Sequence, residues 1–188
     1  MTGPTDAELL GAAADGDGRA WDALVERFGG LVWSIARAHR LSAADAADVS
    51  QTAWLRLVEN LGRIREPDRV GAWMATTTRN ECLRVIRRSG RQVPTDMDVD
   101  AEPPDTASPL ADEGLLTGER DAALWRAFSA IPERCQVLLR LLISDPPPSY
   151  EEIGAALGMP VGSIGPTRAR CLEHLRRRTG ITSLLGGS

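Results

Sequence analysis

The sequence predicts an all-α protein: two small helical domains joined by an acidic, flexible linker, with a helix-turn-helix in the C-terminal domain. On both sides of the middle, apolar residues recur at steps of three and four, and no window alternates apolar and polar residues long enough for a sheet. The middle is rich in proline and acid, so it cannot bury enough surface to offset its ordering entropy. We expect domains at 1–92 and 119–188 and a linker at 93–118.

Composition indicates a soluble, cytoplasmic protein. Of its 188 residues, 43% are hydrophobic and 26% are charged, which is typical of a soluble globular protein and excludes collagen-like and wholly disordered chains. No apolar run approaches the ~20 residues that cross a bilayer. Asp6 and Glu8 lie where a signal peptide would be basic. We therefore expect no membrane insertion.

The charge is unevenly distributed along the chain. The net charge is −4, and by region it is +1 for residues 1–92, −8 for 93–123 and +3 for 124–188. All 22 basic residues are arginine, which is typical of a GC-rich genome and suits recognition of phosphate and guanine. The acidic middle is either a solvated spacer or a segment that occupies a basic channel of a partner.

Three helices are expected in the first domain. An apolar stripe predicts a helix over residues 19–40. Ser42 and Asp45 resemble a capping pair that opens the next helix, which stops near Gly62. Pro67 fits the first turn of the third helix. The residues expected to face the core include Trp21, Leu24, Phe28, Leu31, Ile35, Val49, Ala53, Leu57, Leu61, Val70, Trp73, Met74, Val85 and Ile86.

Four helices are expected in the second domain. The first covers residues 119–131, and Pro132 begins the second. After a proline run, Ser149 and Glu152 form a capping box for a short third helix, and the last helix runs from about 163 to 178. The residues expected on inner faces are Leu124, Trp125, Phe128, Val137, Leu138, Leu141 and Leu142.

The last two helices have the pattern of a helix-turn-helix. Gly154 is small where two helices approach closely, Gly158 can adopt the positive φ that ends a helix, and Ile164 returns an apolar residue to the core. If Ser163 is the N-cap, Pro166 lies in the first turn, where backbone N–H groups have no helical partner. The proline then fixes where the second helix begins.

Two helix faces are candidates for DNA binding. The start of a recognition helix meets base edges, and the residues there are Ser163, Gly165, Thr167, Arg168 and Arg170, with Arg176, Arg177 and Arg178 further along. In the first domain, Asn80, Arg84, Arg87 and Arg91 follow helical steps, with Arg79 and Arg88 beside them. The bland alternatives are arginines that complement a helix dipole and a solvated charged face.

Cysteine and histidine usage argues against catalysis and metal binding. The three cysteines, Cys82, Cys135 and Cys171, form no CxxC pair and are expected to be reduced thiols. His39 and His174 are the only histidines, too few for a multi-histidine metal site or a histidine-based catalytic apparatus. We expect no enzyme, no catalytic residue, no metal and no cofactor.

Two motif blocks resemble a known family. The segment Asp48-Val-Ser-Gln51-Thr-Ala-Trp54, followed by Trp73-Met74, Arg79-Asn80 and Arg87-Arg88, resembles region 2 of bacterial sigma factors. Ser149-Tyr-Glu-Glu-Ile153, Leu157-Gly158 and Val161-Gly162-Ser163-Ile164 resemble region 4. The order of the blocks, the linker and the length resemble an extracytoplasmic-function sigma factor, which has only these two regions.

The resemblance implies a function and positions for it. It implies a sigma factor that binds core RNA polymerase, recognises minus-thirty-five and minus-ten promoter elements and melts DNA to start transcription of a specific regulon. Asp48, Gln51, Trp54 and Leu55 would dock on the β′ clamp helices, although Trp54 could instead belong to the core. Arg79, Asn80, Arg84, Arg87 and Arg88 would read the minus-ten element. Ser163, Gly165, Pro166, Thr167, Arg168 and Arg170 would read the minus-thirty-five element, and region 4 would sit on the β flap.

Some residues depart from the family pattern, and other functions stay open. Position 84 is often aspartate in the family, and the Gly165-Pro166-Thr167 segment replaces arginine and serine, so Ser163, Arg168 and Arg170 become the favoured base contacts. An anti-sigma factor is a further candidate partner. The alternatives are a transcriptional regulator that uses only the helix-turn-helix, with the first domain as a sensor or dimeriser, and an adaptor that mimics nucleic acid through its acidic middle.

Overall fold

The computed structural model describes residues 3–90 and 119–179, and over these residues the protein is all-helical, as predicted. The predicted linker at 93–118 and the C-terminal residues from 180 lie outside the described part. The helices are α1 (Asp6–Ala14), α2 (Gly18–Ala38), α3 (Ala43–Asn60), η1 (Leu61–Arg63), η2 (Pro67–Arg69), α4 (Val70–Arg88), α5 (Glu119–Ser129), α6 (Glu133–Leu142), α7 (Tyr150–Leu157) and α8 (Val161–Thr179).

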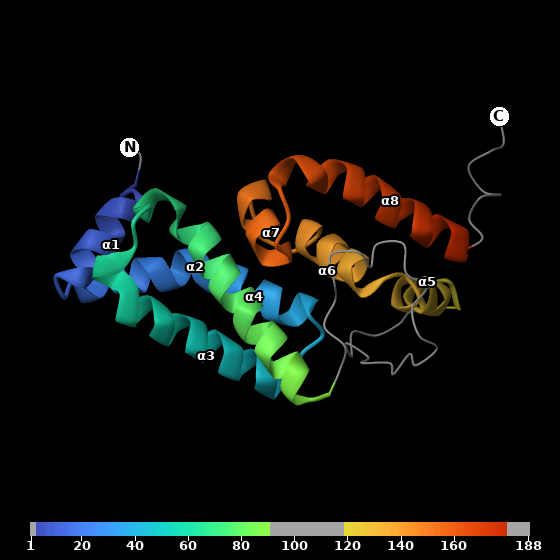
Figure 1. Ribbon diagram of the computed structural model, residues 1–188, viewed down its shortest axis with the longest axis horizontal. Helices are drawn as coiled ribbons and strands as arrows, with labels where there is room; N and C mark the ends of the chain where they lie inside the picture. The colour runs from blue at the N-terminus through green and yellow to red at the C-terminus, as the bar shows by residue number, and fades with distance from the viewer. Residues whose placement is uncertain (1–2, 91–118, 180–188) are drawn as a thin grey trace.

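Helices α1 to α4, with the short 3-10 helices η1 and η2, form what we call the N-terminal unit (Figure 1). The long helices α2, α3 and α4 pack on one another around fully buried Leu24, Ile35, Leu57, Met74 and Ile86. These are residues of the predicted apolar stripes, so the stripes correctly identified the core.

Helix α1 was not predicted from the sequence. It begins with a capping box in which the Thr5 hydroxyl accepts from the Glu8 N–H and the Glu8 carboxylate accepts from the Thr5 N–H. Leu9 and Leu10 bury it against the unit, and Asp6 forms an ion pair with Arg27 of α2. The spacing Thr5-x-x-Glu8 was the available signal.

The other predicted helix starts in this unit are close to those observed. Ser42 is the N-cap of α3, and its hydroxyl accepts from the Asp45 N–H at 3.0 Å, as predicted. Pro67 opens the 3-10 helix η2, and α4 begins after it at Val70. Pro67 therefore lies before α4 and not in its first turn, where it was predicted.

Helices α5 to α8 form what we call the C-terminal unit. Ile131, Leu138, Leu141, Ile153 and Ile164 are fully buried at its centre. The predicted capping box of α7 is present, because the Ser149 hydroxyl accepts from the Glu152 N–H and the Glu152 carboxylate accepts from the Ser149 N–H.

The inner face predicted for α5 is wrong for Leu124 and Trp125 and correct for Phe128, which packs against the core. Leu124 is 46% and Trp125 44% exposed, whereas Ala127 is buried and Phe128 is half-buried. Trp125 instead packs edge-on against Phe128, with ring centroids 5.8 Å apart. In the described part of α5, the contacts with the core come from Ala127 and Phe128 in its last turn, and the chain continues from there to buried Ile131, two residues before α6.

The turn between α7 and α8 forms as predicted, but α8 begins earlier than expected. Gly158 is left-handed with φ of 63°, and a Cβ on Gly154 would lie 2.8 Å from the Met159 carbonyl oxygen, so both positions require glycine. Helix α8 starts at Val161, so Ser163 is its third residue and not its N-cap, and Pro166 lies beyond the first turn. The Ser163 hydroxyl donates to the Pro160 carbonyl at 2.7 Å.

The two units pack directly on each other. Helix α7 lies against α4, and α6 lies against α2, so the N- and C-terminal units meet along two pairs of helices (Figure 1). At the second pair, the Arg140 guanidinium donates to the Ala38 carbonyl at 3.3 Å, at the C-terminal end of α2. The same guanidinium lies 5.2 Å from the centroid of the Phe128 ring. Within the described ranges, no helix is long and apolar enough to cross a membrane.

Candidate nucleic-acid interface

One face of α3 is exposed and partly apolar. Asp48, Gln51 and Leu55 are exposed, and Leu55 keeps 56% of its accessible surface. Trp54 is half-buried and packs edge-on against Trp21 at 5.7 Å between centroids, so much of its surface belongs to the core. These residues follow one another at helical steps, so they form an exposed stripe beside a structural tryptophan.

Sequence reasoning missed one member of this stripe. Val58 is 51% exposed and follows Leu55 by three residues on α3. Two large apolar side chains in solvent on adjacent turns make the stripe a candidate for a protein partner. The signal was present in the sequence, because the same helical spacing links Gln51, Leu55 and Val58.

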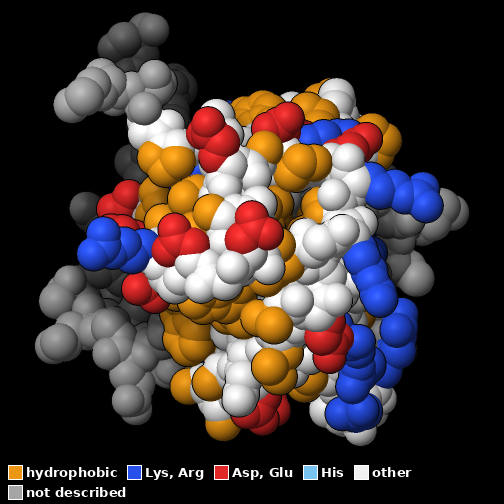
Figure 2. All heavy atoms as spheres, turned by 90° about the vertical axis from the view of Figure 1, so that its left-hand side faces the viewer, with side chains coloured by type: hydrophobic (Ala, Val, Ile, Leu, Met, Phe, Trp, Pro, Cys, Tyr) orange, Lys and Arg blue, Asp and Glu red, His pale blue; other side chains and the backbone are white. Residues whose placement is uncertain are grey.

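The basic face of α4 is exposed near its C-terminal end. Asn80, Arg84, Arg87 and Arg88 are exposed, and Arg84 forms an ion pair with Glu81 at 3.1 Å. Asn80, Arg84 and Arg87 are four and three residues apart, which brings them onto one side of the helix. In Figure 2, arginine side chains gather along the right-hand edge of the view, beside a face of mixed apolar and acidic side chains.

Arg79 does not lie with this exposed group. It is half-buried at the contact with the C-terminal unit, where a Cβ on Gly158 would lie 2.9 Å from its Cζ atom. The predicted minus-ten set is therefore divided: four members face solvent, and the fifth is packed against the turn between α7 and α8.

The predicted minus-thirty-five set is divided as well. Gly165, Pro166, Arg168 and Arg170 are exposed, and Ser163 is half-buried. Thr167 is only 2% exposed, because it shares the inner face of α8 with buried Ile164 and Cys171. Its hydroxyl lies 3.4 Å from the Arg170 Nη2 atom. In this structure, the burial of Thr167 leaves it no access to a base edge.

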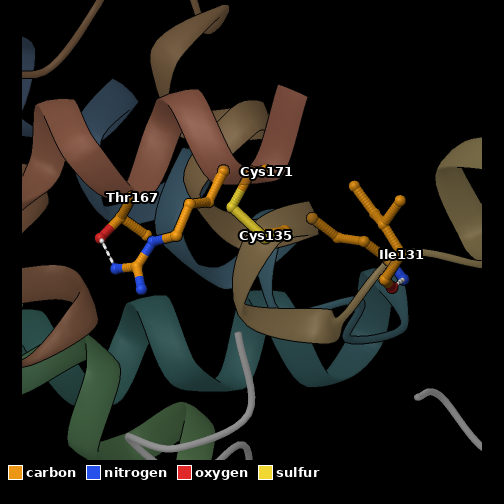
Figure 3. Close-up of a disulfide and its surroundings, with 6 residues drawn as sticks. Ile131, Cys135, Thr167 and Cys171 are labelled. Carbon is orange, nitrogen blue, oxygen red and sulfur yellow. Dashed lines mark hydrogen bonds between the residues drawn. A yellow bond between two sulfur atoms is a disulfide. The ribbon is translucent and has the colours of Figure 1, made fainter. Parts of the chain in front are cut away.

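A disulfide holds α8 in place, contrary to the prediction of reduced thiols. Cys135 of α6 is bonded to Cys171 of α8, with their Cα atoms 5.2 Å apart and both side chains fully buried (Figure 3). The two cysteines are 36 residues apart and have no motif spacing. Only the packing of α6 against α8 brings them together, so the sequence carried no signal for the pair.

The remaining cysteine is a buried thiol. Cys82 of α4 is fully buried, and burial raises its pKa to about 12. A thiol with such a pKa is neutral near pH 7, and a neutral thiol is a poor nucleophile. In the described part of the chain, no group of three or more histidine, cysteine, aspartate or glutamate side chains is arranged to hold a metal ion.

A cleft lies between the two units. Its volume is about 880 Å³, and its walls come from η1, η2, α4, α7 and the start of α8. Four arginines line it, namely Arg63, Arg65, Arg69 and Arg79. The Arg69 guanidinium forms ion pairs with Glu151 of α7 and, at 2.9 Å, with Glu66, and both contacts raise its pKa above the ordinary value. Of these four arginines, the predicted basic faces included only Arg79.

Comparison with known proteins identifies the family. Residues 24–92 match the sigma-70 region 2 family, a span that includes α3 and α4. The ECF RNA polymerase sigma factor SigE of Mycolicibacterium smegmatis is 30% identical over 181 residues, which cover 92% of this chain and 67% of SigE. The chain belongs to the extracytoplasmic-function group of the sigma-70 family. It is therefore an alternative RNA polymerase sigma factor, a class whose partners are the polymerase core and promoter DNA.

Other relatives agree with this assignment. The ECF RNA polymerase sigma factor SigM of Mycobacterium tuberculosis is 28% identical over 176 residues, covering 94% of this sigma factor and 85% of SigM. The fold matches that of CnrH, solved in complex with the cytosolic domain of CnrY, with a TM-score of 0.62 and 21% identity over 95% of this chain and 99% of that one. The family resemblance inferred from the motifs is thus confirmed.

Proposed function

We propose that this sigma factor recognises a minus-ten promoter element with α4 and a minus-thirty-five element with the first half of α8. After it has bound core polymerase, it melts the promoter DNA so that transcription can start. The observation that carries the proposal is the exposed group Asn80, Arg84 and Arg87 on α4, inside the residues that match sigma-70 region 2. Guanidinium and amide groups on one helix face suit both the phosphate backbone and unpaired bases.

The exposed stripe of α3 is a candidate binding surface for core polymerase. We propose that Asp48, Gln51 and Leu55 dock on the β′ clamp helices, with Val58 as an additional contact and Trp54 as a support for the stripe. The C-terminal unit would sit on the β flap. We also propose that the protein acts in the cytoplasm and that an anti-sigma factor covers some of these faces, which the fold match to CnrH in complex with the cytosolic domain of CnrY supports.

In α8, we propose that the base contacts come from Arg168 and Arg170, with Ser163, Gly165 and Pro166 close to the DNA backbone. Both arginines are exposed, and they lie in the first half of the helix, where recognition helices meet base edges. Thr167 would then support Arg170 from the inner face of the helix through their 3.4 Å contact.

Transcription in vitro tests the function directly. Core polymerase with genomic fragments should give new transcripts that depend on this protein, and their start sites should share two upstream elements. Polymerase binding without new transcripts would favour the adaptor function, and no polymerase binding would favour a helix-turn-helix regulator.

Substitution of the α4 arginines tests whether this face contacts melted DNA and not core polymerase. Arg84→Ala with Arg87→Ala should lower the permanganate reactivity of promoter thymines roughly tenfold while core binding is unchanged, because the lost contacts are to melted DNA. Arg19→Ala is the matched control, since Arg19 is exposed at the other end of the N-terminal unit. A footprint equal to that of the unsubstituted protein would show that this face does not contact melted DNA.

A further inference from the structure

The Cys135–Cys171 bond joins the inner faces of two helices in the C-terminal unit. Cys135 lies in the first turn of α6, and Cys171 lies just past the middle of α8. Both side chains are fully buried, and the two Cα atoms are 5.2 Å apart. This separation is within the range of a disulfide, so two thiols held by the same packing can re-form the bond without rearrangement of the helices.

The bond fixes which side of α8 faces the rest of the unit. Ile164, Thr167 and Cys171 are buried and follow one another at steps of three and four along the helix. Arg168 and Arg170 lie on the other side and are exposed. A covalent link at Cys171 therefore sets the rotation of α8 about its axis, and with it the direction in which both arginines point.

The link is also close to a candidate base contact. Thr167 lies one helical turn before Cys171, and its hydroxyl is 3.4 Å from the Arg170 Nη2 atom (Figure 3). The helices that pack against α8 are short, with 11 residues in α5, 10 in α6 and 8 in α7, so non-covalent burial alone holds it less firmly. Because a binding group must be held within ~0.5 Å of its working position, a looser α8 should recognise bases less well.

We infer that Cys135 and Cys171 form a redox-modification site that controls minus-thirty-five recognition. The disulfide form holds α8 for binding, and the dithiol form binds this element more weakly, so oxidants activate the protein. The inference rests on the proposed function, because it takes the protein to act in the cytoplasm and α8 to contact DNA. Thiols in the cytoplasm are kept reduced, and a disulfide there is usually transient and serves catalysis or redox sensing.

Reduction transfers two electrons and two protons to the pair from a protein dithiol of the thioredoxin class. One thiolate of the reductant attacks the sulfur of Cys135 or Cys171, which breaks the S–S bond and forms a mixed disulfide. The second thiol of the reductant then displaces the protein, which gains two S–H groups while the reductant leaves as a disulfide. Hydrogen peroxide reverses the change: one thiol becomes a sulfenic acid with release of water, and the other thiol displaces a second water as the S–S bond forms.

Thiol labelling tests whether the bond responds to the redox conditions of a cytoplasm. The native full chain is equilibrated with glutathione in its cytoplasmic excess of the reduced form, quenched with acid, unfolded and labelled with a maleimide. The disulfide form has one free thiol, at Cys82, and the dithiol form has three. Most chains should carry three labels after glutathione and one label after hydrogen peroxide. Chains that keep one label in glutathione would show a permanent structural cross-link and overturn the inference.

Promoter binding tests whether the redox state controls recognition. Polymerase holoenzyme with this protein is bound to a promoter fragment found by transcription in vitro, and to the same fragment with a scrambled minus-thirty-five element. The preference for the intact element should fall about three- to tenfold when dithiothreitol reduces the pair, because a partly lost arginine–base contact has an effect of this size. Hydrogen peroxide should restore it. Scrambling the minus-ten element should weaken binding equally in both states.

Cysteine variants assign the response to this bond. Cys135→Ala with Cys171→Ala should show the lower preference whether or not dithiothreitol is present, which also controls for thiols of the polymerase. Cys82→Ala should respond like the unsubstituted protein, since Cys82 lies in the N-terminal unit and is not bonded. The cycle of reduction and oxidation in the unsubstituted protein uses no variant, so the test stands even if the double variant does not fold.

The outcomes separate this inference from the proposed function. An equal preference for the intact element in both redox states would overturn redox control and leave minus-thirty-five recognition standing. A preference that is higher in the reduced state would overturn the assignment of the disulfide as the active form. If neither state distinguishes the intact element from the scrambled one, the proposed role of α8 fails, and redox control of recognition fails with it.

Discussion

The N- and C-terminal units reach stability by different means. The N-terminal unit contains three long helices, of 21, 18 and 19 residues, whose apolar stripes meet in one core, and its single cysteine is a free buried thiol. In the C-terminal unit, three of the helices have only 11, 10 and 8 residues, and a disulfide joins α6 to α8. Short helices bury little surface, so the smaller unit gains more from a covalent cross-link.

The two units also differ in the side chains that they expose. The N-terminal unit presents an apolar stripe on α3 and a basic face on α4, which suit a protein and a nucleic acid. The C-terminal unit presents arginines on α8 and carboxylates on α7, and the latter are turned toward the other unit. The charged side chains of the C-terminal unit are therefore divided between the exposed surface of α8 and the contact of α7 with the N-terminal unit.

The largest expected effect is on the core of the N-terminal unit. Met74→Ala should lower the free energy of unfolding by ~2–5 kcal/mol, because Met74 is fully buried in α4, which packs against both α2 and α3. Chemical denaturation measures the change. Thr76→Ala, at an exposed position on the same helix, should change stability by less than ~0.5 kcal/mol. Equal losses for the two variants would contradict the proposed core.

The next effect is on the C-terminal unit alone. Reduction of the disulfide should lower stability by ~2–4 kcal/mol, because a loop closed over 36 residues no longer restricts the unfolded chain. Thermal unfolding with and without a reductant gives the value. The double variant Cys135→Ala with Cys171→Ala should be insensitive to the reductant, and Cys82→Ala should keep the sensitivity. If the reductant still lowers the stability of the double variant, the effect does not come from the Cys135–Cys171 bond.

A smaller effect separates the DNA contacts of the two units. Arg168→Ala should cost ~1–3 kcal/mol at one base of the minus-thirty-five element, because exposed Arg168 lies in the first half of α8. Binding to matched and singly mismatched promoter fragments measures this loss. If all the fragments lose equally, Arg168 contacts phosphate, and base recognition belongs to another residue.

Much of the fold and part of the candidate site could be predicted from the sequence. Helical stripes identified the core around Leu24, Ile35 and Met74, and the Ser149–Glu152 spacing identified the start of α7. These features are local, because they depend on residues three to seven apart. The exposed residues of α3 and α4 were predictable for the same reason, and the family motifs identified the family.

The rest depends on contacts between distant segments. The Cys135–Cys171 bond requires α6 against α8, and the contact of Arg69 with Glu151 spans 82 residues. The burial of Thr167 follows from which side of α8 faces α6. The exposure of Leu124 and Trp125 likewise depends on where α5 meets its neighbours. Periodicity alone gives none of these arrangements.

The last prediction uses the different cysteines of the two units. Cys82 has its pKa raised by burial from 9.0 to about 12, so between these values the unfolded chain loses a thiol proton that the folded protein keeps. The free energy of unfolding should therefore fall as pH rises above about 9, by at most ~1.4 kcal/mol per pH unit. Disulfide-bonded Cys135 and Cys171 do not titrate, and the chain has no lysine and one tyrosine, so the alkaline background is small.

Denaturation of the unsubstituted protein and Cys82→Ala between pH 7 and about pH 10 isolates this effect, because only their difference in slope is needed. The slope should be steeper with the cysteine present. Parallel curves would mean that the thiolate forms as easily in the folded N-terminal unit as in the unfolded chain. Iodoacetamide would then label Cys82 in the native protein, and the close packing of α4 against α2 and α3 could not be as the structure has it.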